Sequence, residues 1–294
     1  MKRPIPIFTL GLMLLLGSRV CHASTGPGKT DSLEKRRNLI ICYEIKDYDA
    51  QVRKSINTIF YKLIRKGDNL IVYSPAKVYG FSQTTLLRPK EELTHWLQER
   101  MKADCNVASA GYRQVNSELQ ELVEELLRGQ TDTKSVLNRY HQGLENFNSQ
   151  RKINQPLLLK FAAMFRQTPG KNHVVVFFQK EFRPIPDSAL MDTLMQNPDL
   201  AFTATEVFLH PTKQVAKEHS QAVITAFRDA SATMHFAYLK PGRERPPRRM
   251  RLQENSMDMY AFFSQIAKET GGISHTNANP GEMMKALLEI FKSE

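Results

Sequence analysis

The sequence is poor in cysteine and lacks the short motifs that mark common enzyme families. Only three cysteines and one tryptophan occur among the 294 residues. So few cysteines exclude a small disulfide-rich scaffold. The patterns Cys-x-x-Cys, His-Glu-x-x-His, Gly-x-Ser-x-Gly and Gly-x-Gly-x-x-Gly are all absent, and these carry redox, zinc, acyl-transfer and dinucleotide chemistry. We therefore predict that the protein is not an enzyme, with an unrecognised hydrolase as the alternative.

One short stretch imitates a nucleotide-binding loop. Residues 23–30 end in Gly28-Lys29-Thr30 and fit a relaxed phosphate-loop pattern. Such a loop works only between a buried strand and a helix, where backbone N–H groups cradle the phosphate. No strand pattern precedes this stretch, so we predict that the protein binds no cofactor.

The only long apolar run lies near the N-terminus. Two basic residues precede an apolar run over residues 5–17, and a small-residue pattern for cleavage follows. This is the order of parts in a secretory signal peptide. We predict a signal peptide over residues 1–23, cleavage near Ala23–Ser24, a linker over residues 24–37 and a periplasmic or extracellular protein. The run is shorter than the ~20 apolar residues of a membrane helix, and an uncleaved N-terminal membrane anchor is the alternative.

Cleavage at that place leaves two cysteines, Cys42 and Cys105. Cys42 lies inside an apolar strand pattern, where a lone cysteine usually acts as a small core residue. A disulfide bridge between the two is the alternative, because an oxidising compartment permits it.

Strand patterns alternate with amphipathic helix patterns over residues 38–294. The four clearest strand candidates are residues 38–44, 69–74, 173–178 and 233–239. The segments between them carry apolar residues at helical spacing. This alternation predicts an α/β fold with a doubly wound, mainly parallel sheet flanked by helices. His173 and His235 fall within or at the ends of strand patterns, and we expect both to be hydrogen-bonded core groups.

Two segments enlarge this alternating pattern. Residues 103–152 are predicted to contain a helical hairpin, broken at Gly129-Gln130. Residues 240–255 are rich in proline and arginine and are expected to form an extended loop. This segment holds five arginines, which suit phosphate and carboxylate groups: Arg243, Arg245, Arg248, Arg249 and Arg251. No aromatic residue lies among them for base stacking, which disfavours binding of single-stranded nucleic acid.

The order of these elements resembles that of a von Willebrand factor A domain. Three stretches carry the resemblance: residues 38–44 with the helix that follows, residues 67–74, and residues 263–272 with the strand and helix after them. Together with the strand at residues 173–178, they cover most of the chain from residue 38 onward. The resemblance implies the same doubly wound α/β architecture, with the helical hairpin as an insertion.

The resemblance also implies a site that this chain has lost. Many members of the family bind a divalent cation through an Asp-x-Ser-x-Ser motif after the first strand. The matching stretch here begins at Glu44, but Lys46 and Tyr48 replace the two serines. In the family, a further acidic ligand follows the fourth strand. At the matching place this chain has the sequence Gln-Lys-Glu, with Lys180 at its centre. Ammonium groups repel a cation, so the implied site is degenerate and holds no metal.

Two further hypotheses concern the same edge of the sheet. One is a shifted cation site made of Glu44, Asp47 and Glu181, because carboxylate oxygens suit hard cations. The other is that Lys46 or Lys180 pairs with Glu44 where the ion would lie and holds the loop shut.

The charge balance bears on the partner. The whole chain carries a net charge of +11, and removal of three basic residues with the signal peptide gives 11 − 3 = +8. Such an excess favours anionic partners. We predict an exported, non-enzymatic binding or scaffold protein of the bacterial cell envelope that contacts a protein partner without a metal ion. The alternative is electrostatic docking of the Arg243–Arg251 loop on an anionic envelope polymer or membrane surface, and a nucleic acid partner is not expected.

Overall fold

The centre of the protein is a six-stranded sheet in the order β3-β2-β1-β4-β6-β8. The computed structural model describes residues 36–129, 131–151, 153–209, 217–241, 246–278, 285, 287–289 and 291. The strands are β1 (Arg37–Glu44), β2 (Asn69–Tyr73), β3 (Val78–Phe81), β4 (Lys171–Gln179), β6 (Ala232–Leu239) and β8 (Ser274–Ala278). Every neighbouring pair is parallel except β2 and β3, which are antiparallel. The predicted fold class, α/β with a doubly wound, mainly parallel sheet, is confirmed.

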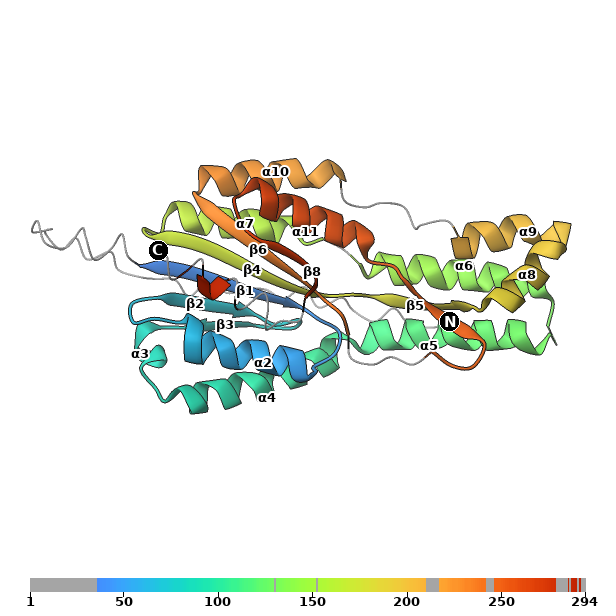
Figure 1. The fold of residues 1–294 in the computed structure, drawn as a ribbon, viewed down its shortest axis with the longest axis horizontal. Coiled ribbons are helices and arrows are strands. Elements are labelled where there is room, and N and C mark those ends of the chain that lie inside the picture. The colour runs from blue at the N-terminus through green and yellow to red at the C-terminus, as the bar shows by residue number, and fades with distance from the viewer. Residues whose placement is uncertain are drawn as a thin grey trace, which may run out of the picture.

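Helices cover both faces of this sheet (Figure 1). The helices on one face are α2 (Ala50–Thr58), the π-helix η1 (Ile59–Leu63) and α4 (Lys90–Ala108). The helices on the other face are α7 (Gln155–Arg166), α10 (Lys217–Asp229) and α11 (Met257–Glu269). The short helix α3 (Gln83–Leu86) follows β3 at the edge of the sheet.

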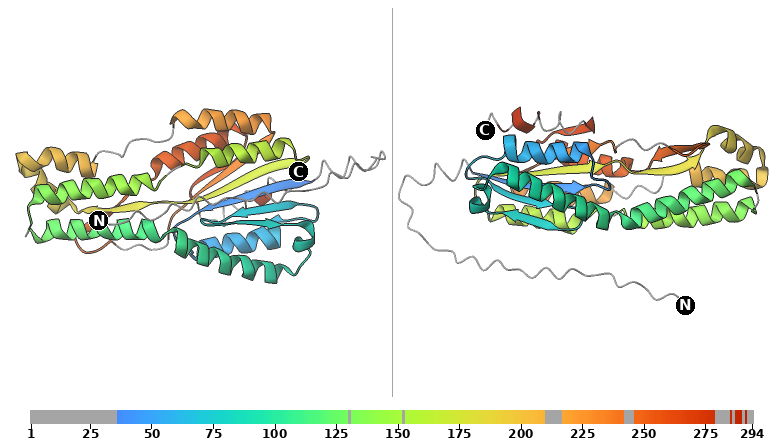
Figure 2. Two further views of the ribbon diagram at one scale, coloured as in Figure 1. Left: turned by 180° about the vertical axis from the view of Figure 1, so that it is seen from behind. Right: turned by 90° about the horizontal axis from the view of Figure 1, so that it is seen from below.

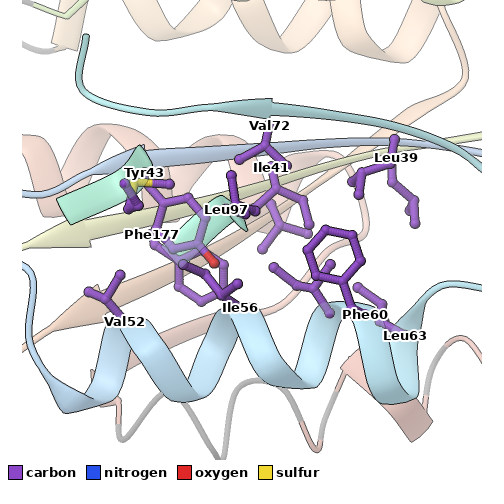
Figure 3. Close-up of a cluster of buried hydrophobic side chains, with 14 of the residues drawn as sticks. Leu39, Ile41, Tyr43, Val52, Ile56, Phe60, Leu63, Val72, Leu97 and Phe177 are labelled. Carbon is purple, nitrogen blue, oxygen red and sulfur yellow. The ribbon is translucent and has the colours of Figure 1, made fainter. Parts of the chain in front are cut away.

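Strand β1 is buried on both faces because its apolar residues run without interruption. Leu39, Ile41 and Tyr43 pack toward α2 and α4 (Figure 3), whereas Ile40 and Cys42 pack toward α7 and α11. This is the alternation that a pleated strand imposes on its side chains.

The two cysteines lie on opposite faces of the sheet. Cys42 belongs to the core under α7, and Cys105 belongs to the core under α4. Both are buried and free. The alternative of a bridge between them is therefore wrong, because the sheet itself separates the two thiols.

Local chemistry fixes the elements next to β1 and β6. The side chain of Asp49 accepts hydrogen bonds from the N–H groups of Gln51 and Val52, which caps the start of α2. Before β8 the chain passes tightly against β6 at Gly272, where a Cβ atom would lie 1.7 Å from the carbonyl oxygen of Met234. Only glycine allows this close approach.

A second group of elements projects from the end of the sheet at which β1 and β4 finish (Figures 1 and 2). We call this group the lobe. Its elements are α5 (Ala110–Arg128), α6 (Thr133–Ser149), β5 (Phe182–Pro186), α8 (Ser188–Gln196), α9 (Pro198–Ala204), the π-helix η2 (Thr205–Leu209) and β7 (Met250–Glu254). The lobe has its own apolar core, which includes Leu119, Tyr140, Ile185 and Phe208.

The structure corrects the expectation of an extended loop over residues 240–255. Residues 250–254 form strand β7, which pairs antiparallel with β5. The composition of the segment concealed this strand, because the Pro/Arg-rich sequence before it is typical of a loop. The hairpin predicted within residues 103–152 corresponds to α5 and α6, since α4 continues to Ala108.

The prediction for the N-terminus lies almost entirely outside the described residues. The signal peptide at residues 1–23 is outside them, and so is the linker up to residue 35. Arg37, placed in the linker by the sequence, is the first residue of β1. Among the helices that the structure describes, none is long and apolar enough to cross a membrane.

Candidate functional site

The lobe joins the sheet at the carboxyl ends of its central strands. Strand β4 ends at Gln179, and only Lys180 and Glu181 separate it from β5 in the lobe. In doubly wound sheets, ligands meet the loops at this edge. The junction of sheet and lobe is therefore the candidate functional site.

The loop after β1 is fastened to the end of β4. The backbone N–H groups of Lys46 and Asp47 both donate to Oε1 of Gln179, each at 2.8 Å. Tyr48 follows in this loop, with its hydroxyl group buried, and desolvation raises its pKa to about 12. The loop that resembles a metal-binding loop is thus held by a neutral amide.

Glu44, the last residue of β1, keeps an exposed surface at this edge. The protein atoms around its carboxyl group desolvate it and raise its pKa above the ordinary value. The nearby Lys46 ammonium lowers the pKa of Glu44, and the Glu181 carboxylate raises it further. Two carboxyl groups and one lysine therefore share this part of the edge.

A buried ion-pair network links four separate segments at the junction. Glu181 is only 2% exposed, and its Oε1 lies 3.2 Å from Nζ of Lys46. Its Oε2 accepts a 2.6 Å hydrogen bond from Nε of Arg151, which follows α6. The guanidinium of Arg151 also pairs with Asp258 of α11, and the Lys46 ammonium lies 5.4 Å from the ring centre of Tyr112.

A second polar cluster ties β6 to the end of β7. Nζ of Lys180 lies 3.2 Å from Oε2 of Glu254 and 4.8 Å from the ring centre of Tyr238. The Tyr238 hydroxyl donates to Oε1 of Glu254 and lies 2.6 Å from Oγ of Ser256. Desolvation and the hydrogen bond to Glu254 raise the pKa of Tyr238 well above its ordinary value.

These contacts correct the hypothesis that Lys46 or Lys180 pairs with Glu44. Both lysines do form ion pairs, but Lys46 pairs with Glu181 and Lys180 pairs with Glu254. The loop after β1 is hydrogen-bonded to Gln179 at the end of β4. The Lys46 side chain therefore lies beside Glu181 and the ring of Tyr112.

The hypothesis of a shifted cation site concerns the same carboxylates. Over the part of the chain that the structure describes, no three His, Cys, Asp or Glu side chains are grouped to hold a metal ion. Both carboxylate oxygens of Glu181 face a cationic side chain instead, from Lys46 and from Arg151. An ion bound there would have to displace these two partners.

The arginine cluster is described only in part. Arg243 and Arg245 lie outside the described residues. Arg248 and Arg249 are exposed in the turn before β7, and Arg251 is exposed within β7. Nε of Arg249 lies 3.8 Å from the Asp187 carboxylate. These arginines lie on the lobe, outside the network around Glu181.

Several buried polar residues of the lobe were missed by the sequence reasoning. Tyr112 and Tyr140 follow the apolar pattern of amphipathic helices, so they are indistinguishable from ordinary core residues. Arg183 is 1% exposed and donates to the carbonyl oxygen of Val207 at 2.9 Å and to Oε1 of Gln253 at 2.7 Å. Desolvation lowers its pKa. No local pattern marks an arginine for burial, because its partners come from distant segments.

A small cavity opens beside Glu44. Its lining includes Cys42, Asn154, Phe161 and Phe263, and its volume is about 20 Å³. A cavity of this size has room for about one water molecule, which is too little for a cofactor.

The comparisons with known proteins give no family. No family model and no curated protein match the sequence. Similar solved structures include the N-terminal domain of TFIIH p34, with 8% identity, a TM-score of 0.38 and coverage of 87% of this chain and 97% of that one. An aerotolerance-related membrane protein from Bacteroides fragilis shows 11% identity and a TM-score of 0.36, covering 88% of this chain and 99% of that one.

A third similar structure is human COPII-coat protein Sec24c. It shows 7% identity and a TM-score of 0.40, over 87% of this chain and 32% of that one. Scores this low do not transfer a function. The fold class therefore rests on the strand order and the directions of the strands described above.

Proposed function

We propose that the protein is an exported, non-enzymatic binding protein of the bacterial cell envelope that holds a protein partner through its lobe, without a metal ion. The position of the lobe carries this proposal. The lobe is built on the edge where doubly wound sheets bind their ligands, and the network around Glu181 fixes it there.

The charges at the junction support a metal-independent mode of binding. Lys46 and Arg151 neutralise Glu181 from both sides. A divalent cation placed beside them would meet two positive side chains at short range. The edge therefore serves to position the lobe, and the outer surface of the lobe serves to bind.

That outer surface exposes large apolar side chains. Phe202 of α9 is 72% exposed, and Leu209 of η2 is 53% exposed. Contiguous exposed apolar patches mark protein contacts, and we propose that Phe202 and Leu209 contribute to such a contact. A matched residue lies at the opposite end of the molecule, where Leu87, directly after α3, is 73% exposed (Figure 1).

These residues define the test. The chain from Ser24 onward is immobilised and used to capture proteins from envelope extract of the producing cells, at low and high salt, with and without EDTA. We expect one protein to be captured under all four conditions by the wild type and by the Leu87→Ser variant. We expect the double variant Phe202→Ser, Leu209→Ser to lose it. Loss in EDTA alone contradicts the metal-independent mode, and equal capture by all variants contradicts the role of the lobe.

A second candidate function is electrostatic docking on an anionic polymer or membrane surface. The observation that favours it is the exposure of Arg248, Arg249 and Arg251 on one part of the lobe. Such contacts weaken sharply as salt rises. Capture that disappears only at high salt, together with salt-sensitive sedimentation on anionic vesicles, favours this function over the first.

A further inference from the structure

The two strands of the lobe pair in a defined register. The N–H of Asn255 donates to the carbonyl oxygen of Glu181 at 2.9 Å, and the N–H of Asp187 donates to the carbonyl oxygen of Arg249 at 3.1 Å. These bonds flank the antiparallel ladder at its two ends. Residues of such a ladder alternate between bonding to the partner strand and facing away from it. The odd-numbered residues of β7 therefore bond to β5, and the even-numbered residues face outward.

The prolines of β5 agree with this register. Pro184 lies opposite Leu252, and Pro186 lies opposite Met250. Proline has no N–H to donate, so it fits only where the strand does not bond to its partner. Both prolines occupy such positions.

The outer edge of β5 is closed by two tyrosines. The Tyr112 hydroxyl donates to the carbonyl oxygen of Phe182 at 3.1 Å. It also accepts from the backbone N–H of Phe182 at 3.3 Å. The Tyr140 hydroxyl donates to the carbonyl oxygen of Pro184 at 2.6 Å. Helices α5 and α6 thus satisfy the backbone groups that a further strand would otherwise take.

The outer edge of β7 is open by comparison. Among the described residues, no hydrogen-bond partner is found for the outward N–H and C=O groups of Leu252 and Glu254. The N–H of Met250 is taken by the carbonyl oxygen of Pro247 at 3.2 Å. An edge with unpaired backbone groups is a template for a strand from another chain.

The charge along this edge selects the chemistry of the partner. Arg248 and Arg249 are exposed in the turn before β7, and Arg251 is exposed within the strand. When two charged residues lie directly opposite each other on paired strands, charges of opposite sign attract and charges of like sign repel. An extended segment rich in Asp or Glu therefore fits this edge, and a basic segment does not.

We propose that β7 binds an extended, acidic segment of a protein partner, which adds to the β5–β7 sheet as a third strand. This inference rests on the proposed function and names the kind of partner segment that the lobe takes. A backbone edge recognises a polypeptide, because its donors and acceptors alternate at the spacing of a peptide chain. Anionic polymers and lipid head groups do not match that spacing.

The proposal is tested with a synthetic peptide. The probe is a fluorescein-labelled peptide of alternating Glu and Val that is longer than β7, titrated with the chain from Ser24 onward. The control peptide has the same sequence with every backbone nitrogen methylated, so it keeps the charge and loses the N–H donors. We expect the control peptide to bind about tenfold more weakly or worse.

Two protein variants complete the test. Arg251→Glu reverses the charge on the edge, and Lys134→Glu makes the same change on the exposed surface of α6 in the same lobe. We expect Arg251→Glu to weaken binding about tenfold and Lys134→Glu to leave it unchanged. Amide exchange gives a direct readout. The amides of Leu252 and Glu254 exchange fast in the free protein and become protected when the peptide binds.

The outcomes separate this inference from the proposed function. Equal binding of the parent and methylated peptides overturns strand pairing and leaves a contact through charge alone. Absence of peptide binding also overturns the inference. If partner capture still depends on Phe202 and Leu209 in that case, the proposed function stands while β7 is excluded as its site. If neither the double variant Phe202→Ser, Leu209→Ser nor the variant Arg251→Glu loses the captured protein, the proposed function fails, whatever the peptide shows.

Discussion

The hydroxyl group of Tyr140 donates a hydrogen bond of 2.6 Å to the carbonyl oxygen of Pro184. Tyr140 is fully buried in α6, and Pro184 lies in β5. Because Pro184 faces away from β7, this bond satisfies an acceptor that would otherwise be buried without a partner. Helix α6 is thereby joined to β5, just as the Tyr112 hydroxyl joins α5 to β5.

The substitution Tyr140→Phe tests this relationship. It removes the hydroxyl and leaves the buried carbonyl of Pro184 unsatisfied, which costs about 1–3 kcal/mol of folding free energy. Urea unfolding measures the change. Tyr61→Phe is the matched control, because Tyr61 is 50% exposed, and its free energy of unfolding is expected to stay at the wild-type value. An equal effect of the two substitutions contradicts the role given to Tyr140.

The central sheet could be predicted because its strands are buried on both faces. Residues 173–178 form a continuous apolar run, and they lie within β4, Lys171–Gln179. The lobe strands carry no such signal. Strand β5 contains two prolines, which argue against a strand, and β7 contains a single fully buried residue, Met250. The outer edge of β5 is hydrogen-bonded by Tyr112 and Tyr140 from distant helices, and local patterns do not reveal such contacts.

The candidate site was predicted in position and missed in its contacts. The stretch from Glu44 to Tyr48 does lie at the carboxyl edge of the sheet. The partner of Lys46 is Glu181, from a segment 135 residues further along the chain. Sequence spacing does not predict such a contact, since it depends on how the loop after β1 folds over the end of β4.

Among the residues of the junction, Glu181 is predicted to be the one whose neutralisation lowers the free energy of unfolding most. Glu181→Gln removes the carboxylate that faces Lys46 and Arg151, while Arg151 keeps its pair with Asp258. Removing one partner of a buried pair costs about 3–5 kcal/mol when the other charge is left uncompensated, so we expect a smaller loss here, of about 1–3 kcal/mol. Glu92→Gln is the control, because its pair with Arg88 is exposed and such pairs contribute about 1 kcal/mol or less. Chemical denaturation compares the two variants with the wild type. Similar losses in both would show that the Glu181 network is not buried in solution.

Magnesium and EDTA are predicted to leave the thermal stability unchanged. A ligand that binds the native state raises the melting temperature in proportion to the logarithm of its concentration. The carboxylate of Glu181 already forms ion pairs with Lys46 and Arg151, so no such rise in melting temperature is expected with excess Mg²⁺. Sodium chloride of the same ionic strength is the control. A rise that follows the Mg²⁺ concentration and is reversed by EDTA would reveal a metal site at this edge.

The buried histidine pair is predicted to make the fold sensitive to acid. Nδ1 of His173 lies 3.3 Å from Nε2 of His235, and the N–H of Ile273 donates to Nδ1 of His235 at 3.4 Å. Burial, and secondly the neighbouring His173, lower the pKa of His235 to about 3. In the unfolded chain a histidine has a pKa of about 6.5. The unfolded state therefore takes up a proton between these values while the folded state does not.

The sign of the effect follows from this difference. Since the folded-state pKa is the lower one, the contribution of His235 to stability is complete above about pH 6.5 and is lost as the pH falls toward 3. At pH 4.5 the loss amounts to about 2–3 kcal/mol. The substitution His235→Asn keeps an acceptor near the Ile273 N–H and removes the titrating ring. We expect the variant to be less stable than the wild type at pH 7.5 and to lose less stability on acidification.

Urea unfolding at a series of pH values measures this difference. His141→Gln is the control, because the His141 side chain is 52% exposed. The control variant is expected to follow the wild-type curve of stability against pH. Parallel curves for His235→Asn and the wild type would mean that another group is responsible for the acid sensitivity, because removal of the buried imidazole must remove its share of the slope.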